Sequence, residues 1–116
     1  MPKNSKSYDL LSDAALNSLT KLGERLREAR LRRNWTQAET ADKAGLSDSS
    51  VKKVESGSAH ITIGAYLSML DVFGLPMGFD GVMVAGEDTL GEALSRHALR
   101  QRARSAQSSS EDDWEI

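Results

Sequence analysis

The sequence predicts an all-α fold of about five helices, on three observations. Apolar residues recur at three- and four-residue steps through most of the chain, a spacing that places them on one face of a helix. Residues that cap helix N-termini precede these segments, and glycines follow them. The length of 116 residues suits one small domain with tails.

Composition narrows the classes of protein to consider. The chain has no cysteine, which excludes disulfides and Cys-based metal sites. No apolar run approaches the roughly 20 residues that span a bilayer, and no apolar segment follows the polar N-terminus. We therefore expect a cytoplasmic protein without membrane contact. No serine or histidine has a catalytic partner at a readable spacing, so we expect no enzyme, metal site or cofactor.

Charge is segregated along the chain, although its net value is only −2. Residues 21–60 carry nine Lys and Arg against six acidic residues. Residues 61–95 hold no Lys or Arg and five acidic residues. Four arginines follow between 96 and 104, and four acidic residues lie in 105–116. Such segregation is expected where one surface of a protein binds an anionic ligand and its other surfaces have other roles.

The first predicted helix follows a disordered arm over residues 1–8 and runs from about Asp9 to Arg33. Leucines and alanines recur along it at helical steps. Gly23 interrupts the pattern at a cost of about 1 kcal/mol. The interruption suggests two helices with a joint near Lys21.

Two short helices are predicted next. Thr36 and Glu39 form a capping box at the start of the first, and Gly45 ends it where positive φ is needed. Ser47 caps the second, which runs over residues 48–56. Two short helices joined by a tight turn make a helix-turn-helix pattern.

A fourth helical segment is predicted over residues 62–74, and its C-terminal side is ambiguous. Residues 76–86 fit a short helix with Phe79, Val82 and Met83 inward, or else a short strand. Glycines within the segment weaken the helical interpretation, which we nevertheless favour.

A last helix is predicted after Asp88, which can cap it. It ends among arginines near residue 104, where positive charge suits the helix dipole. The predicted organisation is a disordered arm (1–8), a helix-turn-helix domain that also dimerises (9–86), a C-terminal helix (87–104) and a disordered acidic tail (105–116).

One stretch resembles the helix-turn-helix of the λ-repressor-like (Xre) regulators: TQAETADKAGLSDSSVKKVESG. Its flanks LGERLREARLRRNW and ITIGAYLSMLDVFGL resemble that family's first and fourth helices, so the resemblance covers residues 19–86. With DTLGEALSRHALRQRAR added, the chain is similar to HipB-type antitoxins, which pair with HipA-type kinase toxins. Thr40 departs from the family's usual core leucine, and its hydroxyl costs stability unless it bonds to a backbone carbonyl.

The resemblance implies that residues 48–56 form a recognition helix in the major groove of DNA. It also implies an ion pair between Arg30 and Glu55. The arginines between residues 25 and 33 fit a solvated helix face, the interpretation we favour, or DNA contacts, for which Arg32 and Arg33 are the candidates. Lysines can donate to guanine, and helix N-termini suit phosphates. The expected DNA-binding residues are Thr36, Gln37, Ser47, Asp48, Ser49, Lys52, Lys53 and Ser58.

We interpret the chain as a sequence-specific DNA-binding antitoxin that represses its own operon and neutralises a HipA-like kinase toxin. The alternatives are a stand-alone or phage-type repressor without a toxin, and a protein-interaction module without DNA binding. One module makes few base contacts, so we expect a homodimer on an operator with an inverted repeat. The fourth helix and residues 76–94 would join the copies. Trp114 has no local core. It is either a hydrophobic residue of the tail without a role of its own or, as we propose to test, the residue that binds a partner protein.

Overall fold

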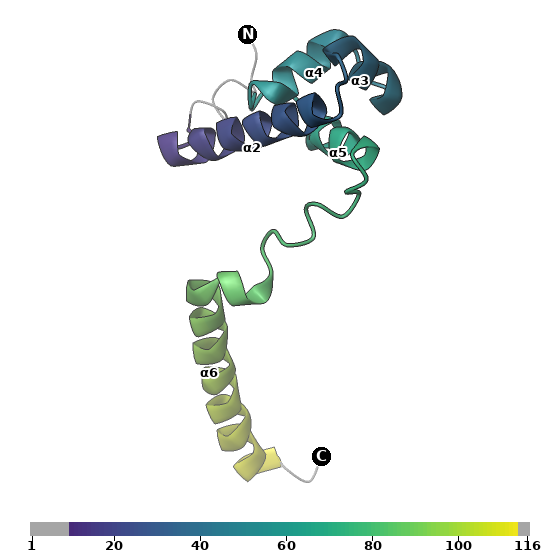
Figure 1. The fold of residues 1–116 in the computed structure, drawn as a ribbon. Helices are drawn as coiled ribbons and strands as arrows, with labels where there is room; N and C mark the ends of the chain where they lie inside the picture. Colours follow the sequence, from purple (N-terminus) through teal and green to yellow (C-terminus); the bar gives the residue numbers. More distant parts are fainter. Residues whose placement is uncertain (1–9, 114–116) are drawn as a thin grey trace. The chain divides into compact units, whose positions relative to one another are not determined.

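The computed structural model describes residues 10–113, with the side chains of 107–113 excluded. No strand occurs in this part of the chain, so the all-α prediction is confirmed. None of its helices is long and apolar enough to cross a membrane. The elements are α2 (Asp13–Arg32), α3 (Gln37–Ala44), α4 (Asp48–Glu55), α5 (Ile63–Val72), the 3₁₀ turn η1 (Ala85–Glu87) and α6 (Thr89–Asp113) (Figure 1).

The chain divides into two compact units between Phe79 and Asp80. The first unit holds α2 to α5, and the second holds η1 and α6. The predicted domain boundary at residue 86 therefore lies inside the second unit.

The long helix α2 is continuous, and the predicted joint near Lys21 is wrong. It begins after Ser12, whose hydroxyl accepts a hydrogen bond from the Ala15 amide at 3.1 Å. Gly23 is buried where α2 meets the end of α4. A Cβ at this position would lie 2.6 Å from the carbonyl oxygen of Val54. The glycine thus permits close packing of two helices and does not mark a break.

The core of the first unit lies among its four helices. α3 and α4 pack on each other, both contact α5, and α2 packs on α4 (Figure 1). Met69, Val51 and Val54 are completely buried at the centre. The other buried apolar residues are Leu26, Ala29, Ala41, Ala65, Tyr66, Leu70 and Phe73.

Thr40 is a polar residue in this core, with no exposed surface. Its hydroxyl donates to the carbonyl oxygen of Thr36 at 2.9 Å, one turn earlier in the chain. The buried hydroxyl thus has the backbone carbonyl partner that it needs to avoid a cost in stability.

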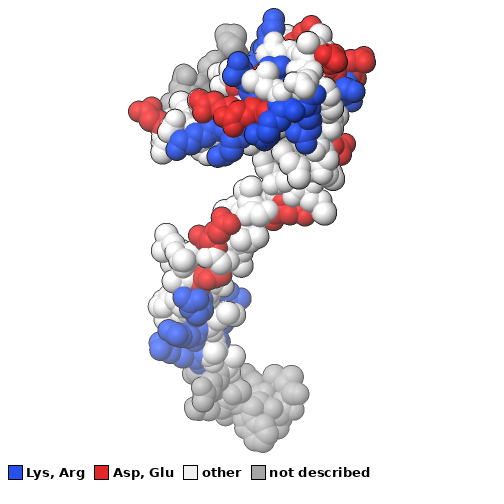
Figure 2. Space-filling model, viewed as in Figure 1, with Lys and Arg blue, Asp and Glu red and all other residues white. Residues whose placement is uncertain are grey.

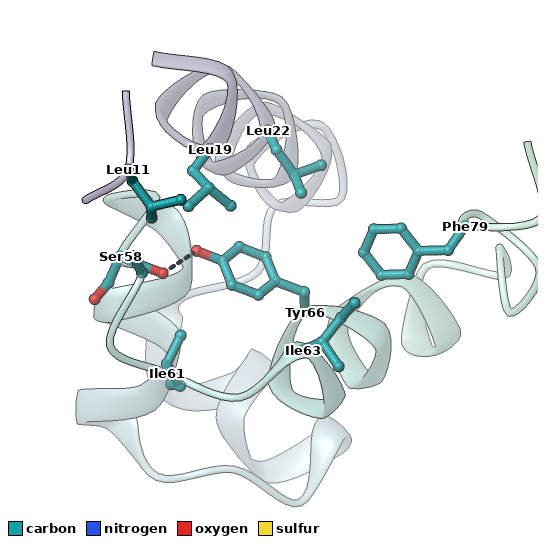
Figure 3. Close-up of a pocket in the computed structure, with 9 residues that line it drawn as sticks. Leu11, Leu19, Leu22, Ser58, Ile61, Ile63, Tyr66 and Phe79 are labelled. Carbon is teal, nitrogen blue, oxygen red and sulfur yellow. Dashed lines mark hydrogen bonds between the residues drawn. The ribbon is translucent and has the colours of Figure 1, made fainter. Parts of the chain in front are cut away.

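An apolar hollow of about 240 Å³ opens between α2 and α5 (Figure 3). Tyr66 forms part of its wall, and its hydroxyl donates to the carbonyl oxygen of Ser58 at 2.7 Å. Burial raises the pKa of Tyr66 above its ordinary value, since the phenolate form is disfavoured away from water. The apolar side chains that line the hollow include Leu11, Leu19, Leu22, Ile61, Ile63 and Phe79.

The segment after α5 forms neither the helix nor the strand considered for residues 76–86. It consists of turns that lead into η1. Phe79 packs against the core as expected, but Val82 and Met83 are 62% and 71% exposed rather than inward. Met83 adopts a φ of 62°. Glycines in the segment offer little helical propensity, and no buried apolar face compensates for them.

The last helix, α6, extends nine residues beyond its predicted end at 104 and finishes at Asp113. Asp88 caps its start as predicted, accepting a hydrogen bond from the Gly91 amide at 3.1 Å. The acidic, serine-rich composition had indicated disorder from residue 105 onward. Adding residues to an existing helix needs no new nucleus, so weak helix formers can continue it. Trp114 lies outside the described residues.

Candidate nucleic-acid interface

The helix α4 has one anchored face and one open face. Ser47 caps it, accepting a hydrogen bond from the Ser50 amide at 3.1 Å. Val51 and Val54 hold its inner face in the core with no exposed surface. The outer face carries the exposed side chains of Asp48, Ser49, Lys52 and Lys53.

A tight turn delivers the chain from α3 to α4. Gly45 adopts a φ of 68°, in the left-handed region that favours glycine. The amide of Leu46 donates to the carbonyl oxygen of Ala41 at 2.9 Å, and the Leu46 side chain packs against the core. The short connection between the two helices is therefore held by a backbone hydrogen bond and by the packing of the Leu46 side chain.

The predicted capping box opens α3. The Glu39 amide donates to the Thr36 hydroxyl, and the Glu39 carboxylate accepts from the Thr36 amide, both at 3.0 Å. The hydrogen bond from the Thr36 backbone holds the pKa of Glu39 below its ordinary value. The Thr36 hydroxyl is thus committed to holding the helix end.

A buried polar network, which we call the Arg30 network, connects α2, α3 and α4. The guanidinium of Arg30 binds the carboxylate of Glu55 through Nε at 2.5 Å and Nη2 at 3.1 Å. Its Nη1 donates to the carbonyl oxygen of Trp35 at 2.8 Å, and the side-chain amide of Gln37 donates to the Glu55 carboxylate at 3.0 Å. The ion pair predicted from the resemblance is confirmed. It fixes the C-terminal end of α4 against the other two helices.

Four of the predicted site residues carry structural hydrogen bonds. Gln37 is half-buried in the Arg30 network, and Thr36 belongs to the capping box. Ser47 caps α4, and its hydroxyl also donates to that of Ser50 at 2.9 Å. The Ser58 hydroxyl accepts a hydrogen bond from the His60 amide at 3.0 Å.

The other four predicted site residues share the open face of α4. Among the described residues, no hydrogen bond or ion pair engages the side chains of Asp48, Ser49, Lys52 and Lys53. They are therefore available to a ligand.

Arg33, a candidate DNA contact from the sequence, has a structural position instead. Its guanidinium donates to the carbonyl oxygens of Ala29 and Phe73, each at 2.9 Å. It also lies 4.8 Å from the centre of the Phe73 ring, over its face. Arg33 thus ties the end of α2 to the end of α5. Arg32 is exposed.

The surface of the first unit is mixed in charge. Figure 2 shows a row of basic side chains along α2 with acidic side chains beside it. Glutamates and arginines alternate at helical spacing in this part of the sequence, a pattern that supports an exposed helix. A strong attraction for nucleic acid from α2 alone is not expected.

The geometry defines a class of protein. A short capped helix is held by a glycine turn and a buried apolar face, and it presents polar and cationic side chains outward. This is the arrangement of the helix-turn-helix DNA-binding proteins. Residues 21–78 match the family model described as a helix-turn-helix domain, so the chain belongs to this family, whose members are Xre/Cro-like. Among curated proteins, none matches the sequence significantly.

Proposed function

We propose that the chain is a transcriptional regulator that inserts α4 into the major groove of operator DNA. The observation that carries the proposal is the open face of α4, whose four polar side chains have no described partner. Lys52 and Lys53 supply donors for guanine edges or phosphates. Asp48 and Ser49 lie in the first turn of the helix, the part that meets base edges in this class.

Both lysines are changed to alanine in the experiment that tests this proposal. We expect Lys52→Ala/Lys53→Ala to weaken binding to the DNA upstream of the gene by about 1–3 kcal/mol if either lysine contacts a base. The control is Arg25→Ala/Arg27→Ala, which removes the same charge from exposed positions on α2. Affinity for a random duplex shows whether the two lysines recognise particular bases or only the phosphate backbone.

Two outcomes would overturn the recognition-helix assignment or the DNA-binding role itself. Unchanged affinity in the lysine variant would remove α4 from the interface. If the unaltered chain binds neither its upstream DNA nor a random duplex, it acts as a protein-interaction module without DNA binding.

The proposal includes a homodimer on an operator with an inverted repeat. One eight-residue recognition helix contacts few bases, and two-fold symmetry doubles the sequence that is read. Exposed apolar side chains on and after α5 support a dimer face there, since such patches often mark interfaces. Ile63 and Met77 are 71% exposed, Leu75 is 55% exposed, and Leu67 is 40% exposed. The apolar hollow adjoins Ile63 and offers space for side chains of a second copy (Figure 3).

At a finer level, we propose an antitoxin that represses its own operon and neutralises a HipA-like kinase toxin. The support is the resemblance of the chain to HipB-type antitoxins, which extends through the arginine-rich part of α6. Trp114 would anchor the partner protein, and the acidic residues near it would speed encounter with a basic surface.

The antitoxin proposal is tested by titrating a HipA-like kinase encoded beside the gene. We expect the full chain to bind it and the chain lacking residues 105–116 to bind it more weakly, with operator affinity unchanged or slightly higher. Kinase binding that survives the deletion would remove Trp114 from the interface. A full chain that binds the operator but no kinase would be a stand-alone repressor.

A further inference from the structure

The arginines of α6 have no structural role among the described residues. Arg96, Arg100, Arg102 and Arg104 are all exposed. Because α6 continues to Asp113, these arginines lie in its middle. Dipole effects fade beyond the last turn of a helix, so the helix dipole does not explain their position.

No described carboxylate neutralises these arginines. Glu92 lies four residues before Arg96, a spacing that permits an ion pair, yet no ion pair joins these two side chains in the described part of the chain. Figure 2 shows the basic side chains gathered over the middle of α6, with acidic side chains lying toward its start. The result is a local cationic surface on a chain whose net charge is −2.

Three of the arginines form a regular row. Arg96, Arg100 and Arg104 follow each other at four-residue steps, so they share one face of α6. At about 1.5 Å of rise per residue, successive members lie about 6 Å apart along the helix axis. Arg102 projects from another side. This row of guanidinium groups, which turns by about 40° around the helix axis at each step, presents repeated positive charge to an anionic ligand.

We propose that this row binds the phosphate backbone of double-stranded DNA, outside the contacts made by α4. Arginine forms paired hydrogen bonds with phosphate oxygens, and a DNA strand offers one phosphate for about every 3.4 Å of axis. The inference rests on the DNA binding of the helix-turn-helix family and not on the particular residues assigned to α4. Because phosphates carry no sequence information, the row adds affinity and not specificity.

A membrane surface is the less suitable anionic ligand. Helices that lie on membranes oppose their cationic face with large apolar residues. Between residues 95 and 106, Leu99 is the one large apolar residue, and the cationic Arg102 lies on a side away from the row.

The test measures how DNA affinity depends on salt for the full chain carrying Arg96→Ala/Arg100→Ala/Arg104→Ala. Alanine is the best helix former, so α6 is retained, and circular dichroism checks this. Binding is titrated against the upstream DNA and a random duplex. We expect the slope of log affinity against log salt to fall by about 0.9 for each phosphate that the variant no longer neutralises. The affinity should fall by about tenfold or more, equally on both duplexes.

Two controls separate the row from net charge. The variant Lys21→Ala/Arg25→Ala/Arg27→Ala removes three positive charges from exposed positions on α2 and should keep most of the slope. Lysine at the three α6 positions should keep the slope as well, because it preserves the charge. An equal loss of slope in the α2 variant would show a general charge effect and overturn the proposal.

The remaining outcomes also decide. The proposal is overturned if the α6 alanine variant keeps the salt slope of the unaltered chain. If that variant keeps the slope and loses binding to phosphatidylglycerol vesicles, the row binds a membrane surface and the proposal is likewise overturned. If the lysine pair of α4 is needed for DNA binding and the α6 row is not, only this inference fails. If the unaltered chain binds neither duplex, the inference and the proposed function fail together.

Discussion

Replacing Arg30 with alanine tests how α4 is held in position. The substitution removes both hydrogen bonds to Glu55 and the one to the carbonyl oxygen of Trp35. Glu55 is only 8% exposed, so its carboxylate cannot recover full hydration. Gln37 remains as its one described donor. The variant therefore strands a charge in the interior.

The expected loss of stability is large for a protein of this size. Breaking a buried ion pair by removing one partner costs about 3–5 kcal/mol. For a domain of 60–100 residues, 1 kcal/mol shifts Tm by about 4–8 °C. We therefore expect Arg30→Ala to lower Tm by about 12 °C or more. Arg27→Ala is the matched control, because Arg27 is exposed on the same helix and should contribute well under 1 kcal/mol.

Thermal denaturation followed by circular dichroism measures both variants. A third variant, Arg30→Met/Glu55→Leu, replaces the pair with apolar residues and should recover most of the lost stability, since no charge is left stranded. Equal melting temperatures for Arg30→Ala and Arg27→Ala would refute the reasoning, because a buried pair of this geometry could not then be holding α4.

Four further substitutions test the packing and capping of the first unit. Gly23→Ala should destabilise by about 1–3 kcal/mol despite its better helix propensity, because its methyl group would overlap the backbone of α4. Gly64→Ala should stabilise by about 1 kcal/mol, because no atom lies nearer than 3.7 Å to the added Cβ. Urea denaturation measures both variants, and a midpoint that shifts in the same direction for Gly23→Ala and Gly64→Ala would contradict the packing argument. Thr40→Val should change the unfolding free energy by less than about 1 kcal/mol, because the missing hydrogen bond is offset by a buried methyl group; a larger decrease by urea titration would assign the hydroxyl a greater role. Because the pKa of Glu39 is lowered from 4.5, its carboxylate stabilises the fold above pH 4.5, and this contribution is lost as the pH falls further. The unfolding free energy of Glu39→Gln should therefore decline less steeply in acid than that of the unaltered chain. Identical dependence on pH in the two proteins would exclude the effect.

Short-range signals in the sequence determined much of the fold. The capping box at Thr36, the left-handed glycine at 45 and the cap at Ser47 each involve residues within four positions of one another. Their geometry depends on the local backbone, so they predicted α3, α4 and the turn between them. Val51 and Val54 lie three residues apart, a spacing that places them on one face of α4 and leaves the polar side chains between them outward.

Contacts between distant segments were decided only by the tertiary structure. Gly23 had suggested a break in α2, but it lies where the backbone of α4 leaves no room for a side chain. Gln37 had the position of a phosphate ligand, but its amide reaches Glu55, 18 residues away. Arg33 likewise binds the carbonyl of Phe73, 40 residues away. The neighbouring residues in the sequence do not differ between a side chain with a structural partner and one available to DNA. Only the packing of the helices, which brings distant residues together, distinguishes the two.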